Sequence, residues 1–453
     1  MAAALAGCNL APPYRVPVTP GPTASYRETG PWTPAAPSDA APRGRWWAVI
    51  VDPELDRLED RLDSDNPGLA AALARYEQSK AVATRARASL FPELDVGGSA
   101  QDAHYPSLPA SYASAGGSLG YELDLWGRVR NQVAAAKAET QASAADAAAV
   151  RLSLEALLAE TYLGLRGDDA EIDVLAQTET AYRQALDLTL ARFDGGAASE
   201  QDVSRAKTQL GDVQSQLAQA RASRALLEHA IAALVGASAS RFEIAARPVQ
   251  AAPPEVPVGE PSALLQRRPD IAAAERRVAS ANAEIGVYRA ALYPTVTLSA
   301  AGGYDSSGVL AATAASYWAA GPATALLPVF DAGRRRADVT RARAAFDEAA
   351  ATYRQTVLEA FRQVEDELAL ANRLANAEAR QEEAVDAARD TDQIALNRYT
   401  EGAADYLEVV TAQAAELDAR REDVQLRTRR LIASIDLVRA LGGGWSARAS
   451  AER

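Results

Sequence analysis

Residues that could perform nucleophilic or metal chemistry are few in this chain of 453 residues. Its two histidines, His104 and His229, lie far apart in the sequence, and its one cysteine, Cys8, lies near the N-terminus. A zinc site needs several Cys or His ligands, and a Ser-His-Asp triad needs a histidine beside its nucleophile. The sequence offers neither set, and it shows no nucleophile–base pair or cofactor-binding loop. We therefore expect a protein that is not an enzyme and that binds no cofactor.

Cys8 stands in a sequence context that suits lipid attachment. The segment Leu5-Ala6-Gly7-Cys8 resembles a bacterial lipobox, in which small residues precede the cut and the thiol carries the lipid. We expect a covalent lipid on Cys8 and a truncated lipoprotein signal over residues 1–8, since a basic segment is absent and the apolar run is short. A chance cysteine in an alanine-rich start is the alternative. Asn9, directly after the cysteine, resembles lipoproteins that are sent to the outer membrane.

The composition favours long helices and argues against nucleic acid as a partner. Alanine, leucine, glutamate, glutamine and arginine are good helix formers. The formal net charge of -13 and the pI of about 4.9 are opposite to the basic surface that nucleic-acid binding needs. No apolar stretch is long enough to cross a bilayer as a helix, so a membrane-spanning form would have to use strands.

The main feature of the sequence is a duplication with a period near 200 residues. Three short motifs occur twice and in the same order, which chance similarity explains poorly. The paired segments are 88–94 with 290–296, 124–128 with 330–334, and 192–198 with 398–404.

Each copy predicts the same series of elements: a helix ended by proline, two short strands, a very long helix and a returning helix. The first copy places them at 67–90, 93–104, 112–124, 128–192 and 199–235. The second copy places them at 270–291, 295–305, 315–328, 334–397 and 403–441. The strand segments have about the length of tilted transmembrane strands. The long helix would extend roughly 100 Å at 1.5 Å per residue, which suits a duct better than a compact domain.

The copies set the domain organisation. Asp52-Pro53 and Asn66-Pro67 predict helix starts, because each places a capping side chain before a proline. The first returning helix has an a/d heptad seam that Arg224 interrupts. The predicted segments are a signal over 1–8, an extended tether over 9–45, a first repeat over 46–239, a linker over 240–268, a second repeat over 269–441 and a tail over 442–453.

The strand count predicts association of several copies. Four strands cannot close on themselves, and open strand edges are not tolerated in lipid. Two, three or four copies would pool eight, twelve or sixteen strands, and the residues alone leave these alternatives open. An eight-stranded barrel would be filled by side chains, so a wide duct favours twelve strands or more.

A set of motifs, together with the duplication and the lipobox, resembles the TolC-like outer-membrane efflux family, in its lipoprotein (NodT-type) branch that serves RND pumps. The motifs are Trp46-Trp47, Asn66-Pro67, Leu123–Arg128, Arg267–Ile271 and Arg398–Gly402. The resemblance covers almost the whole chain. It implies an α+β membrane protein, a homotrimer in which a long antiparallel α-helical barrel joins a twelve-stranded transmembrane β-barrel with four strands from each chain.

The resemblance also implies a function. The chain would be the outer-membrane channel of a tripartite efflux system, lipid-anchored in the bacterial outer membrane and extending into the periplasm. Its partners would be a periplasmic adaptor, an inner-membrane RND transporter and outer-membrane lipid. It would conduct small toxic compounds or drugs passively while the pump supplies the energy. A duct of the same fold for metal ions or type I secreted polypeptides, and a lipid-anchored coiled-coil scaffold, stay open as alternatives.

A periplasmic gate at the helix turns is a further implication of the resemblance. By position, Leu407, Glu408 and Thr411 match the inward-facing constriction, although Thr411 stands where the family commonly has a carboxylate. Three copies of Glu408 would form an acidic ring that favours cations. Asp202 and Tyr399 match positions that hold neighbouring helices together in the closed state. Solvated charges and seam packing are the alternatives for these side chains.

Two glycines are better explained by the turns themselves. Gly196 and Gly402 follow the long helices, and a sharp turn between helices needs the positive φ that glycine adopts at little cost. The same tip surface is where the family meets its adaptor. Because the two tips differ in sequence, a trimer would be only pseudo-sixfold.

Overall fold

The computed structural model describes residues 8–19, 26–28, 44–102, 111–248, 254, 268–307 and 314–443. The chain forms two compact units. One consists of Met1–Pro20, Ala72–Ala147 and Asp270–Val357, and the other of Gly21–Ala71, Ala148–Pro269 and Leu358–Arg453. The predicted tail beyond 443, most of the predicted linker and part of the predicted tether lie outside the described residues.

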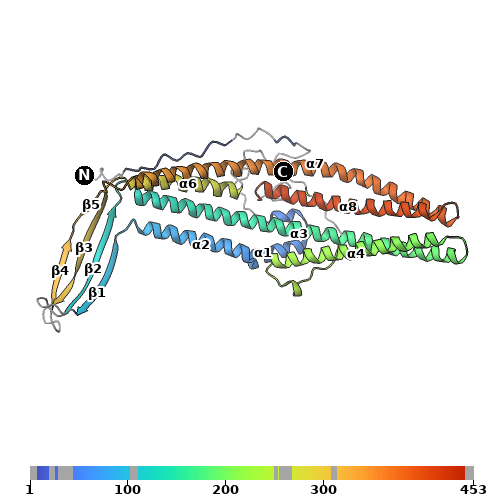
Figure 1. Cartoon of the computed structure of the whole chain (residues 1–453), viewed down its shortest axis with the longest axis horizontal. Helices are drawn as coiled ribbons and strands as arrows, with labels where there is room; N and C mark the ends of the chain where they lie inside the picture. The colour runs from blue at the N-terminus through green and yellow to red at the C-terminus, as the bar shows by residue number, and fades with distance from the viewer. Residues whose placement is uncertain are drawn as a thin grey trace, which may run out of the picture. The chain divides into compact units, whose positions relative to one another are not determined.

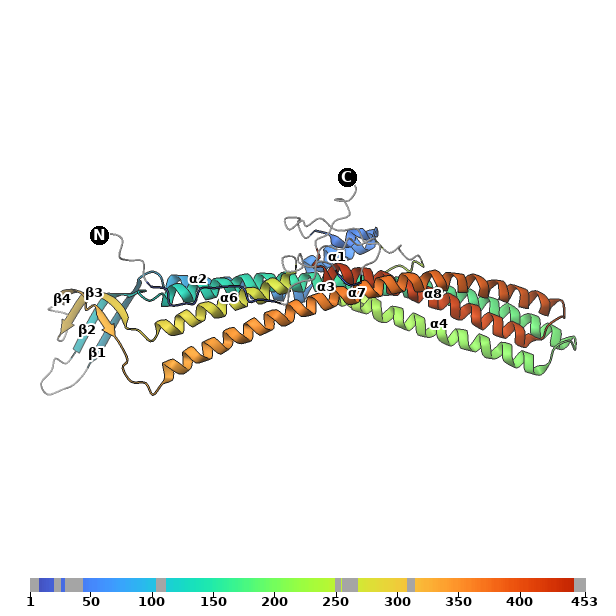
Figure 2. The same ribbon diagram turned by 90° about the horizontal axis from the view of Figure 1, so that it is seen from above.

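The helices confirm the duplication by their lengths. The α2 helix (Pro67–Ala88) and the α6 helix (Pro269–Ala290) each have 22 residues. The α3 helix (Arg128–Asp194) and the α7 helix (Arg334–Thr400) each have 67 residues. The returning helices α4 (Glu200–Leu234) and α8 (Tyr406–Ala440) each have 35 residues. In both views α3 runs beside α4 from their shared turn, and α7 runs beside α8 (Figure 1, Figure 2).

The first helices begin at the predicted caps. The α1 helix (Pro53–Asp65) starts after Asp52, whose Oδ1 accepts a hydrogen bond from the backbone N–H of Glu54 at 3.0 Å. Asn66 precedes α2, and its Oδ1 accepts from the backbone N–H of Leu69 at 2.8 Å. A side chain that accepts from a free helical N–H next to a proline explains both starts.

The strands form one antiparallel sheet in the order β1-β2-β3-β4 (Figure 1). The strands are β1 (Glu93–Asp102), β2 (Ser111–Leu123), β3 (Thr295–Ser307), β4 (Ala314–Ala320) and β5 (Thr324–Leu326). The β2–β3 pairing joins the strands of the two sequence repeats. Among the described strands, β1 pairs only with β2 and β4 only with β3, so each has an unpaired edge within the chain.

The fourth predicted strand, 315–328, is divided. Its two parts, β4 and β5, both pair with β3, and the Gly321-Pro322 step separates them. Proline has no N–H to donate to a strand ladder, and Gly321 has a φ of 103°, so regular pairing stops there. The prediction of one uninterrupted strand was wrong at this step.

The pairing register gives the sheet one apolar and one polar face. Cα partners point to the same face, so Leu94 with Leu119 and Gly302 with Trp318 mark one side. Val96 and Trp318 on this side are each 84% exposed in the single chain. The opposite side includes Glu93, Asp95, Ser118, Glu122 and Thr297. The sheet therefore offers one surface suited to lipid and one suited to water.

The larger core belongs to the second unit. It contains Trp46 and Trp47 with α1 and the middle of α3, and its members include Leu55, Leu58, Leu62, Leu158 and Leu165. The predicted a/d seam of α4 is confirmed, because its apolar positions are buried at Val203, Ala206, Val213, Leu217, Ala220 and Ile231. None of the described helices combines the length and apolar character needed to cross a membrane.

Candidate gate at the helix turns

The first helix turn joins α3 to α4, and we call this pair the first hairpin. The chain reverses at Gly196, which has a φ of 73°. Ser199 caps α4, and its hydroxyl accepts from the backbone N–H of Asp202 at 3.2 Å. The carboxylate of Asp202 accepts in return from the backbone N–H of Ser199 at 3.0 Å. The contacts of Asp202, including an ion pair with Arg205 at 3.7 Å, thus lie within the first turns of α4.

The second turn joins α7 to α8, which form the second hairpin. Gly402 has a φ of 78°, and Asp405 caps α8 by accepting from the backbone N–H of Glu408 at 3.1 Å. The side chain of Glu408 forms an ion pair with Arg398 on α7. Both side chains are substantially exposed, so solvent screens this pair. The acidic group predicted for the constriction therefore has a basic partner on its own hairpin.

Three of the predicted gate residues line one groove of the second hairpin. Leu407, Glu408 and Thr411 lie along it, and its volume is about 540 Å³. The floor includes the buried residues Ala395 and Ala412. Burial and the adjacent carboxylate of Glu416 raise the pKa of Asp392, which lies nearby on α7, to about 6. The groove thus joins a mostly apolar lining to acidic surroundings.

Tyr399 lies outside this groove, where the two hairpins meet. Its ring is 4% exposed and lies 5.3 Å from the ring of Tyr406. The guanidinium of Arg192 from the first hairpin lies 4.5 Å from the centre of the Tyr399 ring, and its Nη1 donates to the carbonyl of Tyr399 at 2.7 Å. Burial raises the pKa of Tyr406 to about 12, so its phenol stays uncharged at neutral pH.

The structure therefore divides the predicted site residues among three places. Leu407, Glu408 and Thr411 share a groove, Tyr399 fills a contact between hairpins, and Asp202 caps a helix. Sequence reasoning missed Arg192 and Arg398 as contact residues. Both belong to the repeated Arg-aromatic-x-x-Gly motif, so the repeated arginine was the signal that could have found them.

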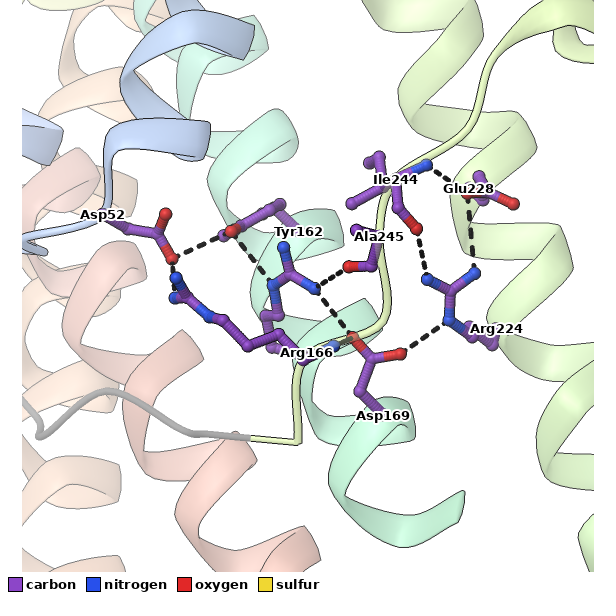
Figure 3. Close-up of polar contacts among 9 residues, drawn as sticks. Asp52, Tyr162, Arg166, Asp169, Arg224, Glu228, Ile244 and Ala245 are labelled. Carbon is purple, nitrogen blue, oxygen red and sulfur yellow. Dashed lines mark hydrogen bonds and ion pairs between the residues drawn. The ribbon is translucent and has the colours of Figure 1, made fainter. Parts of the chain in front are cut away.

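A buried ion-pair network lies farther along the first hairpin (Figure 3). Asp169 on α3 is 3% exposed and accepts from Arg166 Nη1 at 2.8 Å and from Arg224 Nε at 2.6 Å. It also accepts from the backbone N–H of Arg247 at 2.9 Å. One carboxylate thus joins α3, α4 and the segment that follows α4. Arg224, which interrupts the apolar seam of α4, is explained by this buried partner.

The same arginines hold the segment after α4 by its backbone. Arg166 Nη1 donates to the carbonyl of Ala245 at 2.8 Å, and Arg224 Nη2 donates to that of Ile244 at 2.6 Å (Figure 3). Tyr162 donates to Asp52 Oδ2 at 2.8 Å, and Arg247 reaches the same oxygen. The start of the predicted linker is therefore fixed to the helices by charge-assisted hydrogen bonds.

Cys8 lies in the first unit, with its thiol exposed. Its carbonyl oxygen is 3.2 Å from the point where a Cβ on residue 127 would lie, and Gly127 has a φ of 76°. A larger residue at 127 would meet the chain beside the cysteine and would be strained as well. Gly127 lies between the end of β2 at Leu123 and the start of α3 at Arg128, so Cys8 lies where the sheet meets α3.

The segment after Cys8 lies against the helices of its unit. Asn131 Nδ2 donates to Asn9 Oδ1 at 2.9 Å, and Asn282 Nδ2 donates to the carbonyl of Pro12 at 2.9 Å. Tyr14 donates to the carboxylate of Glu275 on α6, which together with burial raises the pKa of Tyr14. Over residues 9–19, the predicted tether is therefore bound through specific hydrogen bonds.

Among the residues that the structure describes, no group of three or more His, Cys, Asp or Glu side chains could hold a metal ion. The features that stand out are the two hairpin tips, the fixed linker and the N-terminal segment.

Comparison with known proteins places these features in context. A family model described as outer membrane efflux protein matches residues 58–237 and 261–443. The pyoverdine export outer membrane protein OpmQ of Pseudomonas aeruginosa is 34% identical over 427 residues, covering 91% of this chain and 90% of that protein. The toluene efflux pump outer membrane protein TtgF of Pseudomonas putida is 30% identical over 466 residues, covering 98% of this chain and 96% of that protein. The solved outer-membrane channel OprN has a TM-score of 0.87 at 29% identity, covering 97% of this chain and 100% of that chain.

Proposed function

The chain belongs to the outer membrane efflux protein family, and on that premise we propose that three copies of it form the exit duct of a tripartite pump. It is an outer-membrane channel of an efflux system. The finer proposal adds a periplasmic adaptor and an inner-membrane RND transporter as its partners. The observation that carries the proposal is a sheet with one apolar face and two unpaired edges, joined to long helical hairpins.

The proposal of three copies rests on the strands. Each chain contributes four strand positions, with β4 and β5 sharing the last, and the free edges of β1 and β4 would pair between copies. Twelve strands would close a barrel with room for a duct, whereas eight would be filled by side chains. The apolar face would then meet lipid, and the polar face would line the aqueous path.

Small toxic compounds or drugs are the proposed cargo. The names of the two relatives mention pyoverdine and toluene, which differ greatly in polarity and size. A passive duct need not recognise its cargo, because the transporter selects it. The proposed substrate class is therefore defined by the pump and not by a binding site in this chain.

Deletion of the gene tests this function. We expect the deletion strain to become more sensitive to toxic small molecules and to recover when the intact gene is restored. The measurement is the minimum inhibitory concentration for a panel of dyes, detergents and antibiotics. Unchanged susceptibility in a strain whose transporter is shown to be active would contradict the proposal.

The proposed gate comprises Leu407, Glu408, Thr411, Asp202 and Tyr399. Leu407 would narrow the path, and three copies of Glu408 would attract cations there. We expect Leu407→Ala to raise the basal conductance of the purified protein in planar bilayers, since it shortens an exposed apolar side chain at the groove. We expect Glu408→Gln to lower the preference for potassium over chloride. If both variants conduct as the unaltered protein does, the gate lies elsewhere.

Lipid attachment at Cys8 is the remaining proposal. The exposed thiol at the junction of sheet and helices would place an acyl chain beside the apolar face of the sheet. The mass of the N-terminal peptide should exceed the polypeptide mass by that of the lipid, and Cys8→Ser should abolish the difference. An unmodified peptide from the outer-membrane fraction would refute it.

A further inference from the structure

The two hairpin tips are equivalent residue by residue. A shift of 206 residues takes Arg192 to Arg398 and Gly196 to Gly402. The same shift takes the helix cap Ser199 to the helix cap Asp405. Each contact that one tip makes can therefore be assigned an equivalent position on the other tip.

The first hairpin has its groove filled within the chain. Ala206 on α4 packs in one apolar cluster with Tyr399 and Tyr406 of the second hairpin. The hydroxyl of Thr189 lies 3.5 Å from that of Tyr399, and Tyr406 donates to Gln209 Oε1 at 3.4 Å. The surface formed by Thr189, Ala206 and Gln209 is thus covered by two tyrosines.

The equivalent surface of the second hairpin is open. Thr189, Ala206 and Gln209 correspond to Ala395, Ala412 and Ala415, and all three alanines line the groove of about 540 Å³. The groove is bordered by Leu407 and Ile394, which are 46% and 58% exposed. Leu407, Ile394 and Ala415 are therefore exposed in the single chain around a floor formed by the buried residues Ala395 and Ala412.

The residue equivalent to Tyr399 shows what would fill this groove. It is Phe193 on the first hairpin, which is 42% exposed where Tyr399 is only 4% exposed. We propose that Phe193 of a second copy of this chain inserts into the groove formed by Ala395, Ala412 and Ala415, beneath Arg398. The contact between copies would then repeat the contact that the two hairpins make within one chain.

One paired difference and one shared arginine support this match. Tyr399 brings a hydroxyl to the hydroxyl of Thr189, whereas Phe193 has no hydroxyl and Ala395 offers none. Both polar partners are lost together, so no buried hydroxyl would lack a hydrogen bond. Arg192 stacks on the Tyr399 ring at 4.5 Å, and Arg398 is placed to stack on Phe193 in the same way.

The contact between hairpin tips, repeated from one copy of the chain to the next, favours a closed ring of copies. The surface that receives an aromatic side chain and the surface that offers one lie on different hairpins, so the contact between copies is head-to-tail. Head-to-tail contacts continue from copy to copy until the rotation closes. This inference rests on the proposed trimer, and it identifies one contact that would hold the hairpin tips of neighbouring copies together.

Thiol cross-linking tests the contact. In a Cys8→Ser background of the full chain, Phe193→Cys is combined with Ala395→Cys and treated with a short thiol-specific cross-linker. We expect covalent products of two and three chains. The matched control combines Tyr399→Cys with Thr189→Cys, the equivalent pair within the chain, and should react only within single chains. Either single-cysteine variant should give no product.

The outcomes separate this proposal from the proposed function. Light scattering in detergent gives the number of chains in each particle. If particles are trimeric and the control pair reacts while the Phe193–Ala395 pair does not, the contact is refuted and the trimer stands. If particles are not trimeric, the proposed duct itself fails. Protection of an Ala415→Cys thiol, at an exposed position of the groove, only after adaptor is added would assign the groove to the adaptor and overturn the contact.

Substitutions that first disrupt and then restore the contact give a second test. Ala395→Leu should fill the groove and exclude the ring of Phe193. The dissociation constant of the trimer should then rise roughly tenfold, as expected when an interface loses the contact of a buried aromatic side chain. Phe193→Tyr should weaken the contact by bringing in a hydroxyl with no partner. Phe193→Tyr with Ala395→Thr should recover association, because it copies the pair at Tyr399 and Thr189. If the trimers of all three variants and of the unaltered protein have the same dissociation constant, the proposal is overturned.

Discussion

Asp169→Ala should lower the free energy of unfolding of the second unit by about 3–5 kcal/mol, the usual cost of removing one partner from a buried ion pair. The side chain of Asp169 is 1% exposed and accepts hydrogen bonds from Arg166, Arg224 and the backbone of Arg247. Its removal deprives Arg166 and Arg224 of the buried carboxylate that they share, although Arg224 keeps a longer ion pair with Glu228 at 3.5 Å. Denaturant titration of the detergent-solubilised protein, followed by tryptophan fluorescence, measures the loss, since Trp46 and Trp47 belong to the core of the same unit.

Amide hydrogen exchange provides a readout specific to the linker. Asp169 accepts from the backbone N–H of Arg247, so this amide should exchange faster in Asp169→Ala than in the unaltered protein. Glu383→Ala is the matched control, because Glu383 pairs with Arg380 at the surface and should change stability by less than about 1 kcal/mol. Equal free energies of unfolding and equal exchange rates of the Arg247 amide in the two variants would show that the network does not hold the linker.

Sequence patterns predicted the elements of the fold well because their ends are marked locally. Prolines and capping side chains mark the starts of α1 and α2, and glycines with positive φ mark the hairpin turns. The break between β4 and β5 also had a local signal in Gly321-Pro322. It was missed because the residues around it have the length and the alternating apolar character of a continuous strand.

Partners that are distant in sequence were harder to predict. Leu407, Glu408 and Thr411 share a groove because they lie one turn apart on one helix, which their spacing shows. The contact of Arg192 with Tyr399 depends on how two hairpins about 200 residues apart pack against each other, and no local pattern fixes that. Arg224 was visible as a break in a seam, but its partner Asp169 lies 55 residues away on another helix.

Nothing in the residue pattern around Glu59 marks its carboxyl group as unusual, although it lies on the buried side of α1. It is fully buried, and neither of its oxygens has a hydrogen-bond partner among the described residues. Burial, reinforced by the acidic neighbours Glu155, Asp63, Asp56 and Asp60, raises its pKa to about 10. The folded protein therefore holds a proton on Glu59 at neutral pH, whereas the unfolded chain releases it above about pH 4.5.

Glu59→Gln should consequently stabilise the protein, and more so as the pH rises. Between about pH 4.5 and 10 the folded state binds one proton more than the unfolded chain, so Glu59 lowers stability by about 1.4 kcal/mol for each pH unit. At pH 7 the accumulated loss is roughly 3 kcal/mol, which a neutral amide of the same shape avoids. The measurement is the melting temperature of both proteins from pH 6 to 9. Glu383→Gln, at an exposed carboxylate of the same unit, is the control and should leave the pH dependence unchanged. Parallel pH profiles for Glu59→Gln and the unaltered protein would show that Glu59 is not the buried proton-binding group.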